Sequence, residues 1–343
     1  MGSRAAGRGP AVSSLNRSRG GLVFLAAGMR GRTVTSLAVV ILAHRDAQHV
    51  GRLIRALGEV PVVLHCDSKA PRDVAEAMVR DAGPNLRSLP RTSAQLSSWS
   101  LVRTELAGLR TAVEISSASH LAVLSGSDYP LVSVQELHER LAAWDGRSYF
   151  MNIPIPFENW NTPRHPDGGR WRSAHRFLTR GDDLITVRGV PARLPWRRRR
   201  PAGLELRASL QWKIYAREDV QRLLRVVDTR PDIVRFWRST FIPEESFAAS
   251  VLSSPAITKE PAVPLCHDVP WYQHWPQSGA HHPSWLDLSH FHEVARRRYA
   301  PAASPAELER PRTGMEKPQA LFGRKFSTAV SSDLLDRIDA ELR

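Results

Sequence analysis

The feature that most constrains the fold is a continuous apolar run, SLAVVILA, at residues 36–43. Its β-branched content is typical of a strand that is buried on both faces. Residues 50–57 then repeat apolar side chains at helical spacing, and residues 60–64 form a second short apolar run. A strand, a helix and a strand in this order make a βαβ unit. We therefore predict a parallel sheet that binds ligands at the carboxyl ends of its strands.

Polar residues follow both of these strands. His44 comes directly after the first strand, and Asp67 stands in the segment His65-Cys66-Asp67-Ser68-Lys69 that ends the second. Each of them alone could be an ordinary loop residue. Because the two strands are neighbours in a βαβ unit, their carboxyl ends lie side by side. The pair therefore predicts a binding site at this edge of the sheet.

Helices and strands continue to alternate along the rest of the chain. We predict strands at residues 120–124, 148–153 and 209–215, and helices at 102–115, 134–141, 217–227, 247–252 and from Ser332. Gly126, Asp128 and Pro130 mark a tight turn after the strand at 120–124. This order predicts an α/β protein with a mostly parallel central sheet flanked by helices.

Composition divides the chain into four segments. Residues 1–33 are rich in Arg, Gly and Ser and are expected to be a disordered leader, 34–153 an α/β half that holds a nucleotide, 154–203 an insertion rich in Trp and Arg, and 204–343 the second half. In the insertion, Arg170 and Trp171 could hydrogen-bond to a sugar and stack on it. Residues 196–201, with four consecutive arginines, are expected to form a disordered surface loop.

The net charge and the cysteine content indicate which partners and which cellular compartment to expect. A net charge of +14 favours acidic partners such as nucleic acid, an anionic membrane or a phosphate-bearing small molecule, although arginine patches also occur on ordinary solvated surfaces. Cys66 and Cys266 are too few for a disulfide framework and lie in apolar surroundings that suit small core residues. The apolar stretch at 21–29 has nine residues where a membrane span needs roughly 20. We expect a soluble, cytoplasmic protein.

Two carboxylates stand in a turn at Phe241-Ile-Pro-Glu-Glu-Ser-Phe247, just before an apolar helix. Pro243 suits a first helical turn, because its missing N–H would be unpaired there. Glu244 and Glu245 could simply complement the dipole at a helix start. Alternatively, one of them is a general base, a carboxylate held beside an apolar wall so that it can accept a proton. The turn alone leaves both interpretations open.

Histidines raise the question of a metal site. Six of them fall within 26 residues, at His267, His274, His281, His282, His290 and His292. No pair has the His-x-x-x-His spacing with a Glu that hydrolytic zinc sites use. On a strand, His290 and His292 would point both rings to the same side. We predict no bound metal.

Taken in order, several short motifs resemble one family, the core-2/I-branching β-1,6-N-acetylglucosaminyltransferases and peptide O-xylosyltransferases. The matching motifs are Ala43-His44-Arg45, Leu64-His65-Cys66-Asp67-Ser68-Lys69, Ser98-Trp99, Leu124-Ser-Gly-Ser-Asp-Tyr-Pro-Leu131, Gln211-Trp212 with Arg217, Pro243-Glu-Glu-Ser-Phe247 and Leu321-Phe-Gly-Arg-Lys-Phe326. The resemblance runs from about residue 36 to residue 328. It implies a GT-A-like glycosyltransferase fold and an inverting transfer of a sugar, with N-acetylglucosamine or xylose expected, from a UDP-sugar to an acceptor hydroxyl.

The resemblance also implies roles for individual residues. In the family, the carboxylate of the Pro-x-Glu motif is the base that deprotonates the acceptor hydroxyl, and this role falls to Glu245. Asp67 contacts uracil, with His44 lining the same pocket, so residues 34–153 become the UDP-binding half. Arg324 and Lys325 grip the diphosphate, and a further family arginine corresponds to Arg310 or Arg312. Residues predicted to bind the acceptor, a glycan, a glycoconjugate or a small molecule, are Asp128, Arg170, Trp171, Trp212 and Glu244, with Glu158 as a looser candidate.

The same resemblance implies catalysis without a metal or other cofactor, the UDP-sugar being a co-substrate. Most GT-A enzymes hold a metal on Asp-x-Asp to neutralise the leaving UDP, and no Asp-x-Asp occurs in this chain. Side-chain cations such as Arg324 and Lys325 can stabilise that charge instead. Animal members are Golgi-anchored and rich in cysteine, which this chain is not. We therefore predict a cytoplasmic member of the bacterial type.

Three other interpretations compete with this one. A basic protein without catalysis could bind nucleic acid through phosphate contacts, but no recognised nucleic-acid motif is present and we predict no nucleic-acid partner. A family member could also have kept the fold and lost catalysis, although Glu245 and Lys325 are both retained. An unrelated phosphoryl transferase would need a P-loop, and that motif is absent.

Overall fold

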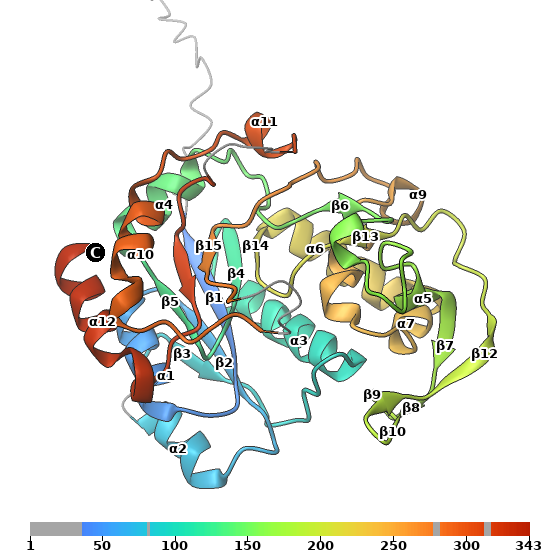
Figure 1. The fold of residues 1–343 in the computed structure, drawn as a ribbon, viewed down its shortest axis with the longest axis horizontal. Coiled ribbons are helices and arrows are strands. Elements are labelled where there is room, and N and C mark those ends of the chain that lie inside the picture. Colours follow the sequence, from blue (N-terminus) through green and yellow to red (C-terminus); the bar gives the residue numbers. More distant parts are fainter. Residues whose placement is uncertain (1–35, 81–82, 277–281, 312–316) are drawn as a thin grey trace, which may run out of the picture. The chain divides into compact units, whose positions relative to one another are not determined.

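Five strands form a central sheet in the order β14-β4-β1-β2-β3 (Figure 1). The structure is a computed structural model that describes residues 36–80, 83–276, 282–311 and 317–343. Strands β4, β1, β2 and β3 run parallel to one another, and β14 pairs antiparallel with β4. Their bounds are β1 (Leu37–Ala43), β2 (Val62–Cys66), β3 (Leu86–Ser88), β4 (His120–Ser125) and β14 (Lys213–Ala216). The predicted mostly parallel sheet is confirmed.

Helices cover both faces of this sheet, which explains why β1 is apolar at every position. Since side chains alternate along a strand, Val39 and Ile41 face one core while Val40 and Leu42 face another. The first core is completed by α1 (Ala47–Ala56), α2 (Arg72–Arg80), α4 (Val134–Ala142), α10 (Phe291–Tyr299) and α12 (Thr328–Glu341). The second core is completed by α3 (Trp99–Ile115), α6 (Arg217–Thr229), α7 (Pro231–Arg238) and α8 (Phe247–Leu252).

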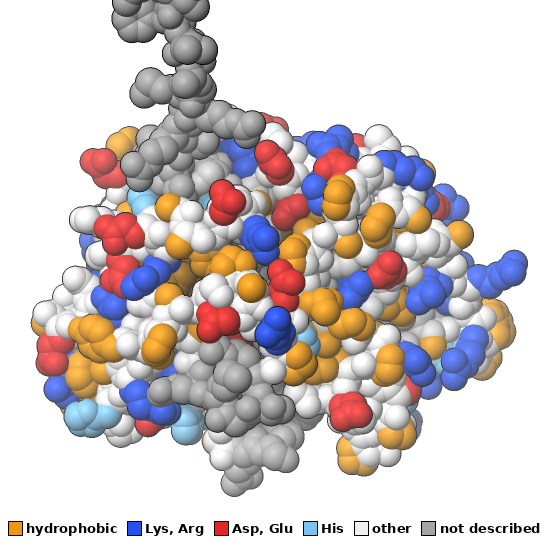
Figure 2. Space-filling model, turned by 90° about the horizontal axis from the view of Figure 1, so that it is seen from above, with side chains coloured by type: hydrophobic (Ala, Val, Ile, Leu, Met, Phe, Trp, Pro, Cys, Tyr) orange, Lys and Arg blue, Asp and Glu red, His pale blue; other side chains and the backbone are white. Residues whose placement is uncertain are grey.

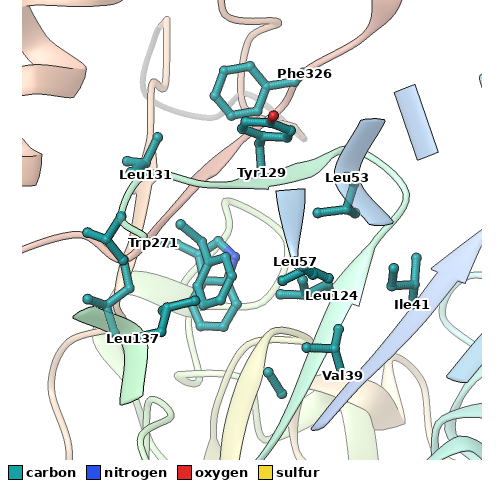
Figure 3. Close-up of a cluster of buried hydrophobic side chains, with 14 of the residues drawn as sticks. Val39, Ile41, Leu53, Leu57, Leu124, Tyr129, Leu131, Leu137, Trp271 and Phe326 are labelled. Atoms are coloured by element: carbon teal, nitrogen blue, oxygen red, sulfur yellow. The ribbon is translucent and has the colours of Figure 1, made fainter. Parts of the chain in front are cut away.

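A second sheet of three short strands extends the first core, in the order β15-β16-β5. Their bounds are β5 (Asp128–Pro130), β15 (Trp271–Gln273) and β16 (Phe322–Arg324). Figure 3 shows Trp271 and Leu137 on one side of the cluster and Tyr129 with Phe326 above it. The Tyr129 and Phe326 rings meet edge to face, 6.0 Å apart. This packing places Arg324 and Lys325, from the end of the chain, beside the turn that follows β4.

Residues 154–203 form short antiparallel pairs and no large element. The strands pair as β6 with β13, β7 with β12, β8 with β9 and β10 with β11. Their bounds are β6 (Ile153–Pro154), β7 (His175–Phe177), β8 (Thr179–Arg180), β9 (Asp183–Leu184), β10 (Thr186–Val187), β11 (Val190–Pro191), β12 (Arg193–Arg197) and β13 (Arg207–Ala208). The remaining short helices are η1 (Glu158–Trp160), α5 (Trp171–Ala174), η2 (Pro243–Glu245), α9 (Pro255–Thr258), η3 (Leu288–His290) and α11 (Pro305–Leu308).

Four local predictions are wrong. Residues 148–153 form no continuous strand, because Tyr149 pairs with Ile214 while Asn152 pairs with Cys266. The strand predicted at 209–215 begins only at Lys213, because the Ser209 amide donates to the Glu245 carbonyl instead of to a ladder. The other two are the loop at 196–201, where Trp196 and Arg197 belong to β12, and the start of the last helix, which exists as predicted but begins at Thr328 and not at Ser332.

Both cysteines lie in the first core and are free thiols, as their apolar surroundings predicted. Burial raises the pKa of Cys66, and it raises the pKa of Cys266 to about 12. In the part of the chain that the structure describes, no helix is both long and apolar enough to cross a bilayer. The predicted leader at 1–33 and the apolar stretch at 21–29 lie outside the described residues.

Close packing between α3 and β1 predicts opposite effects for two helical glycines. A Cβ on Gly108 would lie 2.4 Å from a methyl of Val40, whereas a Cβ on Gly51 would meet only the end of the Arg55 side chain, at 3.4 Å. Both Gly→Ala changes gain about 1 kcal/mol of helix propensity. Overpacking a core costs about 1–3 kcal/mol, and the β-branched Val40 is stiff.

We therefore expect Gly51→Ala to be neutral or stabilising and Gly108→Ala to destabilise the protein. Urea unfolding at an unchanged m-value measures both free energies of unfolding. Equal stabilities of the two variants would show that α3 does not press on β1 as described.

Candidate active site

The site begins where β1 and β2 end side by side. Ala43 pairs with Cys66 at the last position of the ladder, and the Asp67 amide donates to the Ala43 carbonyl at 2.9 Å. His44 and Asp67 therefore lie at neighbouring strand ends, as predicted. The buried Asp67 carboxylate accepts hydrogen bonds from the Lys69 amide at 2.7 Å and the Ala94 amide at 3.0 Å. These bonds hold it at a fixed position at the edge of the sheet.

Cations gather beside these two residues. The Lys325 ammonium lies 4.7 Å from the centre of the Trp285 ring, and the Arg45 guanidinium lies 5.3 Å from the same ring. Burial, and after it the positive charges of Arg324 and Arg45, lower the pKa of Lys325. Within the described ranges Lys325 has no carboxylate partner. Its charge is therefore available to an anionic ligand.

His44 lies in the same field. Burial and Arg45 lower the pKa of its imidazole, Asp67 acts in the opposite direction, and Arg324 again lowers it. All four residues predicted to bind the donor, His44, Asp67, Arg324 and Lys325, are thus brought together at one edge of the sheet.

Arg324 is held by three contacts. Its Nη1 donates to Asp128 Oδ1 at 2.8 Å and also to the Ser125 hydroxyl. Its guanidinium stacks on the Trp212 ring at 4.0 Å. The Asp128 side chain is fully buried, and burial raises its pKa while Arg324 acts in the opposite direction. Asp128 can therefore orient Arg324, but in this conformation it offers no exposed surface to an acceptor.

Glu245 ends the 3₁₀ turn η2, which Pro243 starts. Its side chain is 28 % exposed, and Oε2 accepts a hydrogen bond from Arg172 Nη1 at 2.7 Å. Arg172 in turn stacks on the Trp160 ring at 3.7 Å. Among the described residues, Oε1 accepts no hydrogen bond. One carboxylate oxygen is thus fixed by an arginine and the other is open to a hydroxyl.

Glu244 has the opposite setting. It is 2 % exposed, and Oε1 accepts a hydrogen bond from the Ser97 amide at 2.9 Å. Its Oε2 is buried and has no partner in the described part of the chain. Burial, and after it the charge of Glu245, raises the pKa of Glu244 to about 8. In this conformation the Glu244 carboxyl is therefore buried beside Glu245 and is not accessible to an acceptor.

A buried lysine fixes the Glu244-Glu245 turn to the sheet. The Lys213 ammonium donates to the main-chain carbonyls of Gln211 at 2.9 Å and Glu244 at 3.1 Å. Its counter-ion is the Glu105 carboxylate at 3.5 Å, which also accepts the Tyr215 hydroxyl at 2.8 Å. Burial and the Glu105 charge raise the pKa of Tyr215 well above its usual value, which keeps the hydroxyl a donor.

The short segment 209–212 joins the two ends of the site. Its Ser209 amide donates to the Glu245 carbonyl at 2.8 Å, and its Trp212 ring stacks on Arg324. Three residues of chain span at most about 11 Å. This segment therefore connects the main chain at Glu245 to the ring that stacks on Arg324.

Two residues predicted for the acceptor, Arg170 and Trp171, lie at the start of the short helix α5, which also carries Arg172. The Trp171 ring stacks on His165 at 4.3 Å and contacts Phe241 at 5.2 Å. Arg170 lines a surface pocket together with Arg198 and Arg200. Their roles in acceptor binding stay predictions.

Sequence reasoning missed several residues of the site. Arg172 stands in the same Arg-Trp-Arg stretch as Arg170, but only the fold reveals which arginine faces Glu245. Arg45 belongs to the Ala43-His44-Arg45 motif, but no sequence pattern indicated a role for it. Lys213 and Trp285 carried no signal of their own, since their partners are distant in the sequence.

The segment that holds His290 and His292 is helical and not a strand. His290 closes the 3₁₀ helix η3 and His292 lies in α10, so their rings do not share a strand face. The His274 and His290 rings meet edge to face at 4.9 Å. Over residues 36–80, 83–276, 282–311 and 317–343, no three His, Cys, Asp or Glu side chains are grouped so that they could hold a metal ion. His281 and Arg312 lie outside these ranges.

Comparisons with known proteins identify the family. A search of curated proteins finds no match. Among solved structures, the chain is similar to HddC from Yersinia pseudotuberculosis, with 11 % identity, 55 % of this chain and 79 % of that chain covered, and a TM-score of 0.26. It is also similar to a putative glucose-1-phosphate thymidylyltransferase from Bacillus anthracis in complex with a sucrose. The identity is 10 %, the match covers 58 % of this chain and 78 % of that chain, and the TM-score is 0.28. Scores this low carry no argument about this chain.

The family model for the Core-2/I-Branching enzyme matches residues 37–295, which is most of the chain and includes the strand ends, the Asp128 turn and the Glu244-Glu245 turn. The predicted GT-A-like α/β architecture, a mostly parallel sheet between helices, is confirmed. The chain belongs to the Core-2/I-branching enzyme family and is a glycosyltransferase.

Proposed function

We propose that this glycosyltransferase transfers a sugar from a UDP-sugar to an acceptor hydroxyl with inversion at the anomeric carbon, without a metal, and with Glu245 as the general base. The observation that carries the proposal is the arrangement of opposite charges at one edge of the sheet. An open carboxylate oxygen of Glu245 stands at one end, and the cations Arg324 and Lys325 stand at the other. Segment 209–212 contacts both ends, through the Ser209 amide at the Glu245 carbonyl and the Trp212 ring on Arg324.

The cationic end suits a leaving diphosphate. When the bond between the anomeric carbon and the diphosphate breaks, negative charge develops on UDP, and fixed cations stabilise that charge. Arg324 is already oriented by Asp128, and Lys325 has no competing carboxylate among the described residues. The uracil would lie against Asp67 and His44, where Asp67 is anchored by two main-chain amides.

The other end suits an acceptor hydroxyl. Inversion in one displacement needs one base and no covalent intermediate, so a single placed carboxylate is sufficient. Oε1 of Glu245 would take the hydroxyl proton as the acceptor oxygen attacks the anomeric carbon and UDP departs. Arg172 holds the other oxygen and fixes the direction of the carboxylate.

A metal is not needed in this scheme, because Arg324 and Lys325 supply the positive charge and the sequence has no Asp-x-Asp. We propose N-acetylglucosamine or xylose as the sugar, and a glycan, a glycoconjugate or a small molecule as the acceptor. Trp171, Arg170 and Trp212 are proposed to contact it. Two buried free cysteines agree with a protein of the cytoplasm, which is also part of the proposal.

The role of Glu245 is tested by Glu245→Gln, which keeps the shape of the side chain and removes its basicity. We expect UDP binding to stay nearly unchanged while turnover falls by about two orders of magnitude or more. Isothermal calorimetry with UDP and a steady-state assay with a UDP-sugar measure the two quantities.

A matched control is Glu205→Gln, because Glu205 also pairs with an arginine, Arg207, but is not part of the site. The control should keep wild-type turnover. Wild-type turnover of Glu245→Gln would instead remove Glu245 from catalysis.

The role of Lys325 is tested by Lys325→Ala. Because its charge has no carboxylate partner among the described residues, its loss should cost affinity for the diphosphate and little stability. We expect UDP to bind at least about tenfold more weakly, since hydrogen bonds to charged groups contribute about 1.5–3 kcal/mol. Calorimetry measures the affinity, with the exposed Lys317→Ala as control. An unchanged affinity would exclude Lys325 from the diphosphate site.

A further inference from the structure

Residues 175–200, which we call the arm, expose an unusual number of large apolar side chains. In the described part of the chain thirteen large hydrophobic residues are exposed, and five of them lie in the arm. The most exposed of these five are Val187 at 60 %, Val190 at 62 % and Trp196 at 64 %, and the other two are Leu178 and Ile185. The other eight are scattered over the rest of the chain. A concentration of this kind on a soluble surface marks a site of contact with something apolar.

The arm also carries arginines that have no carboxylate partner. Seven of them are exposed, and none forms an ion pair in the structure as described: Arg176, Arg180, Arg188, Arg193, Arg197, Arg199 and Arg200. Elsewhere in the chain many arginines are paired with Asp or Glu, as Arg103 is with Asp182. Figure 2 shows Lys and Arg side chains near its right-hand edge, the side on which β7 and β12 lie in Figure 1.

The two carboxylates of the arm are turned away from these arginines. Asp182 pairs with Arg103 and Arg238, which belong to the body of the protein. Asp183 accepts a hydrogen bond from the Ser93 hydroxyl at 3.0 Å. The outer surface of the arm therefore carries positive and apolar side chains, whereas its two carboxylates contact residues outside the arm.

The backbone of the arm presents these side chains in an ordered way. Main-chain hydrogen bonds from Leu178 to Ala192, from Ile185 to Leu178 and from Ala192 to Ile185 tie three passes of the chain together. Val187 and Val190 pair directly across a two-residue turn, Arg188-Gly189, whose φ angles of 51° and 78° are both positive. A turn of this kind matches the twist of a hairpin. Two valines and an arginine thus form the tip of the arm, in the region of β8, β9 and β10 in Figure 1.

Arg198, unlike the other arginines, fixes the arm to the body. It donates to the carbonyls of Ser173 and Phe236 at 2.9 and 2.8 Å, and to the hydroxyls of Ser239 and Thr240. Burial, and after it the charge of Arg176, lowers the pKa of Arg198 to about 10. The exposed side chains therefore stand on an anchored support.

We propose that the arm is a docking surface for an anionic lipid bilayer. The valine side chains at the hairpin tip can enter the boundary between headgroups and acyl chains, as the apolar face of an interfacial segment does, and the exposed Trp196 on β12 adds a further apolar contact. Arginines around them meet the lipid phosphates, and each basic residue near an anionic surface contributes about 1 kcal/mol. The contact would be peripheral and does not depend on the proposed chemistry at Glu245.

Nucleic acid fits the same charge less well. Bases stack on aromatic side chains, and Trp196 is the sole exposed aromatic residue of the arm, which the structure describes throughout. The aliphatic residues Leu178, Ile185, Val187 and Val190 have no counterpart in a phosphate backbone. A bilayer explains both the charge and the apolar tip.

The test is co-sedimentation of the full chain with vesicles of phosphatidylcholine alone and vesicles of phosphatidylcholine with phosphatidylglycerol. We expect sedimentation only with the anionic vesicles, and weaker binding as salt is raised. The variant Val187→Ser/Val190→Ser/Trp196→Ser should partition at least about tenfold less, because it keeps the charge and loses both the apolar tip and the exposed Trp196 ring. Val79→Ser/Val330→Ser, which alters exposed valines elsewhere, should bind as the wild type does.

Three outcomes would overturn the proposal: no binding to the anionic vesicles, equal binding by the triple variant, or tighter binding to a single-stranded oligonucleotide than to vesicles. Thermal unfolding and UDP binding of the triple variant, measured alongside, show whether it is folded. Because UDP binding is read separately, failure of the lipid contact leaves the proposed glycosyl transfer untouched.

Discussion

The candidate site depends on the hydrogen bonds and the ion pair of the Lys213 ammonium. It is buried, and it donates to the carbonyls of Gln211 and Glu244 while Glu105 balances its charge. Removing one partner of a buried ion pair leaves an uncompensated charge, which typically costs 3–5 kcal/mol. The lysine thus ties the turn that carries Glu245 to the segment that carries Trp212. This tie connects Glu245, the proposed base, to the segment whose Trp212 ring stacks on Arg324.

The candidate site carries a carboxylate at one end and cations at the other. Arg172 holds one oxygen of Glu245, and Asp128 holds Arg324, so each reactive end is oriented by an opposite charge. Lys325 differs, since it rests on the Trp285 ring and has no carboxylate among the described residues. An enzyme that must stabilise a leaving anion needs such a cation, because charge that is fixed before the reaction requires no reorganisation during it.

Local patterns in the sequence were sufficient for some of these features and insufficient for others. The apolar runs predicted β1 and β2, and hence the meeting of His44 with Asp67, because a strand buried on both faces has a clear signature. Residues 148–153 and 209–212 were misassigned because their partners, Cys266 and Glu245, are distant in the sequence. For the same reason the sequence pointed to Arg170 and not to Arg172. Local sequence does not show which side of a four-residue helix faces a carboxylate.

The most direct test of the central claim is the thermal stability of the purified protein with UDP and a panel of UDP-sugars, each with and without EDTA. A ligand that binds only the native state raises the unfolding temperature. If side-chain cations hold the diphosphate, UDP should stabilise the protein equally in the presence of EDTA, and the most effective UDP-sugar should identify the donor. Stabilisation that EDTA abolishes, or none by any of these nucleotides, would contradict the account.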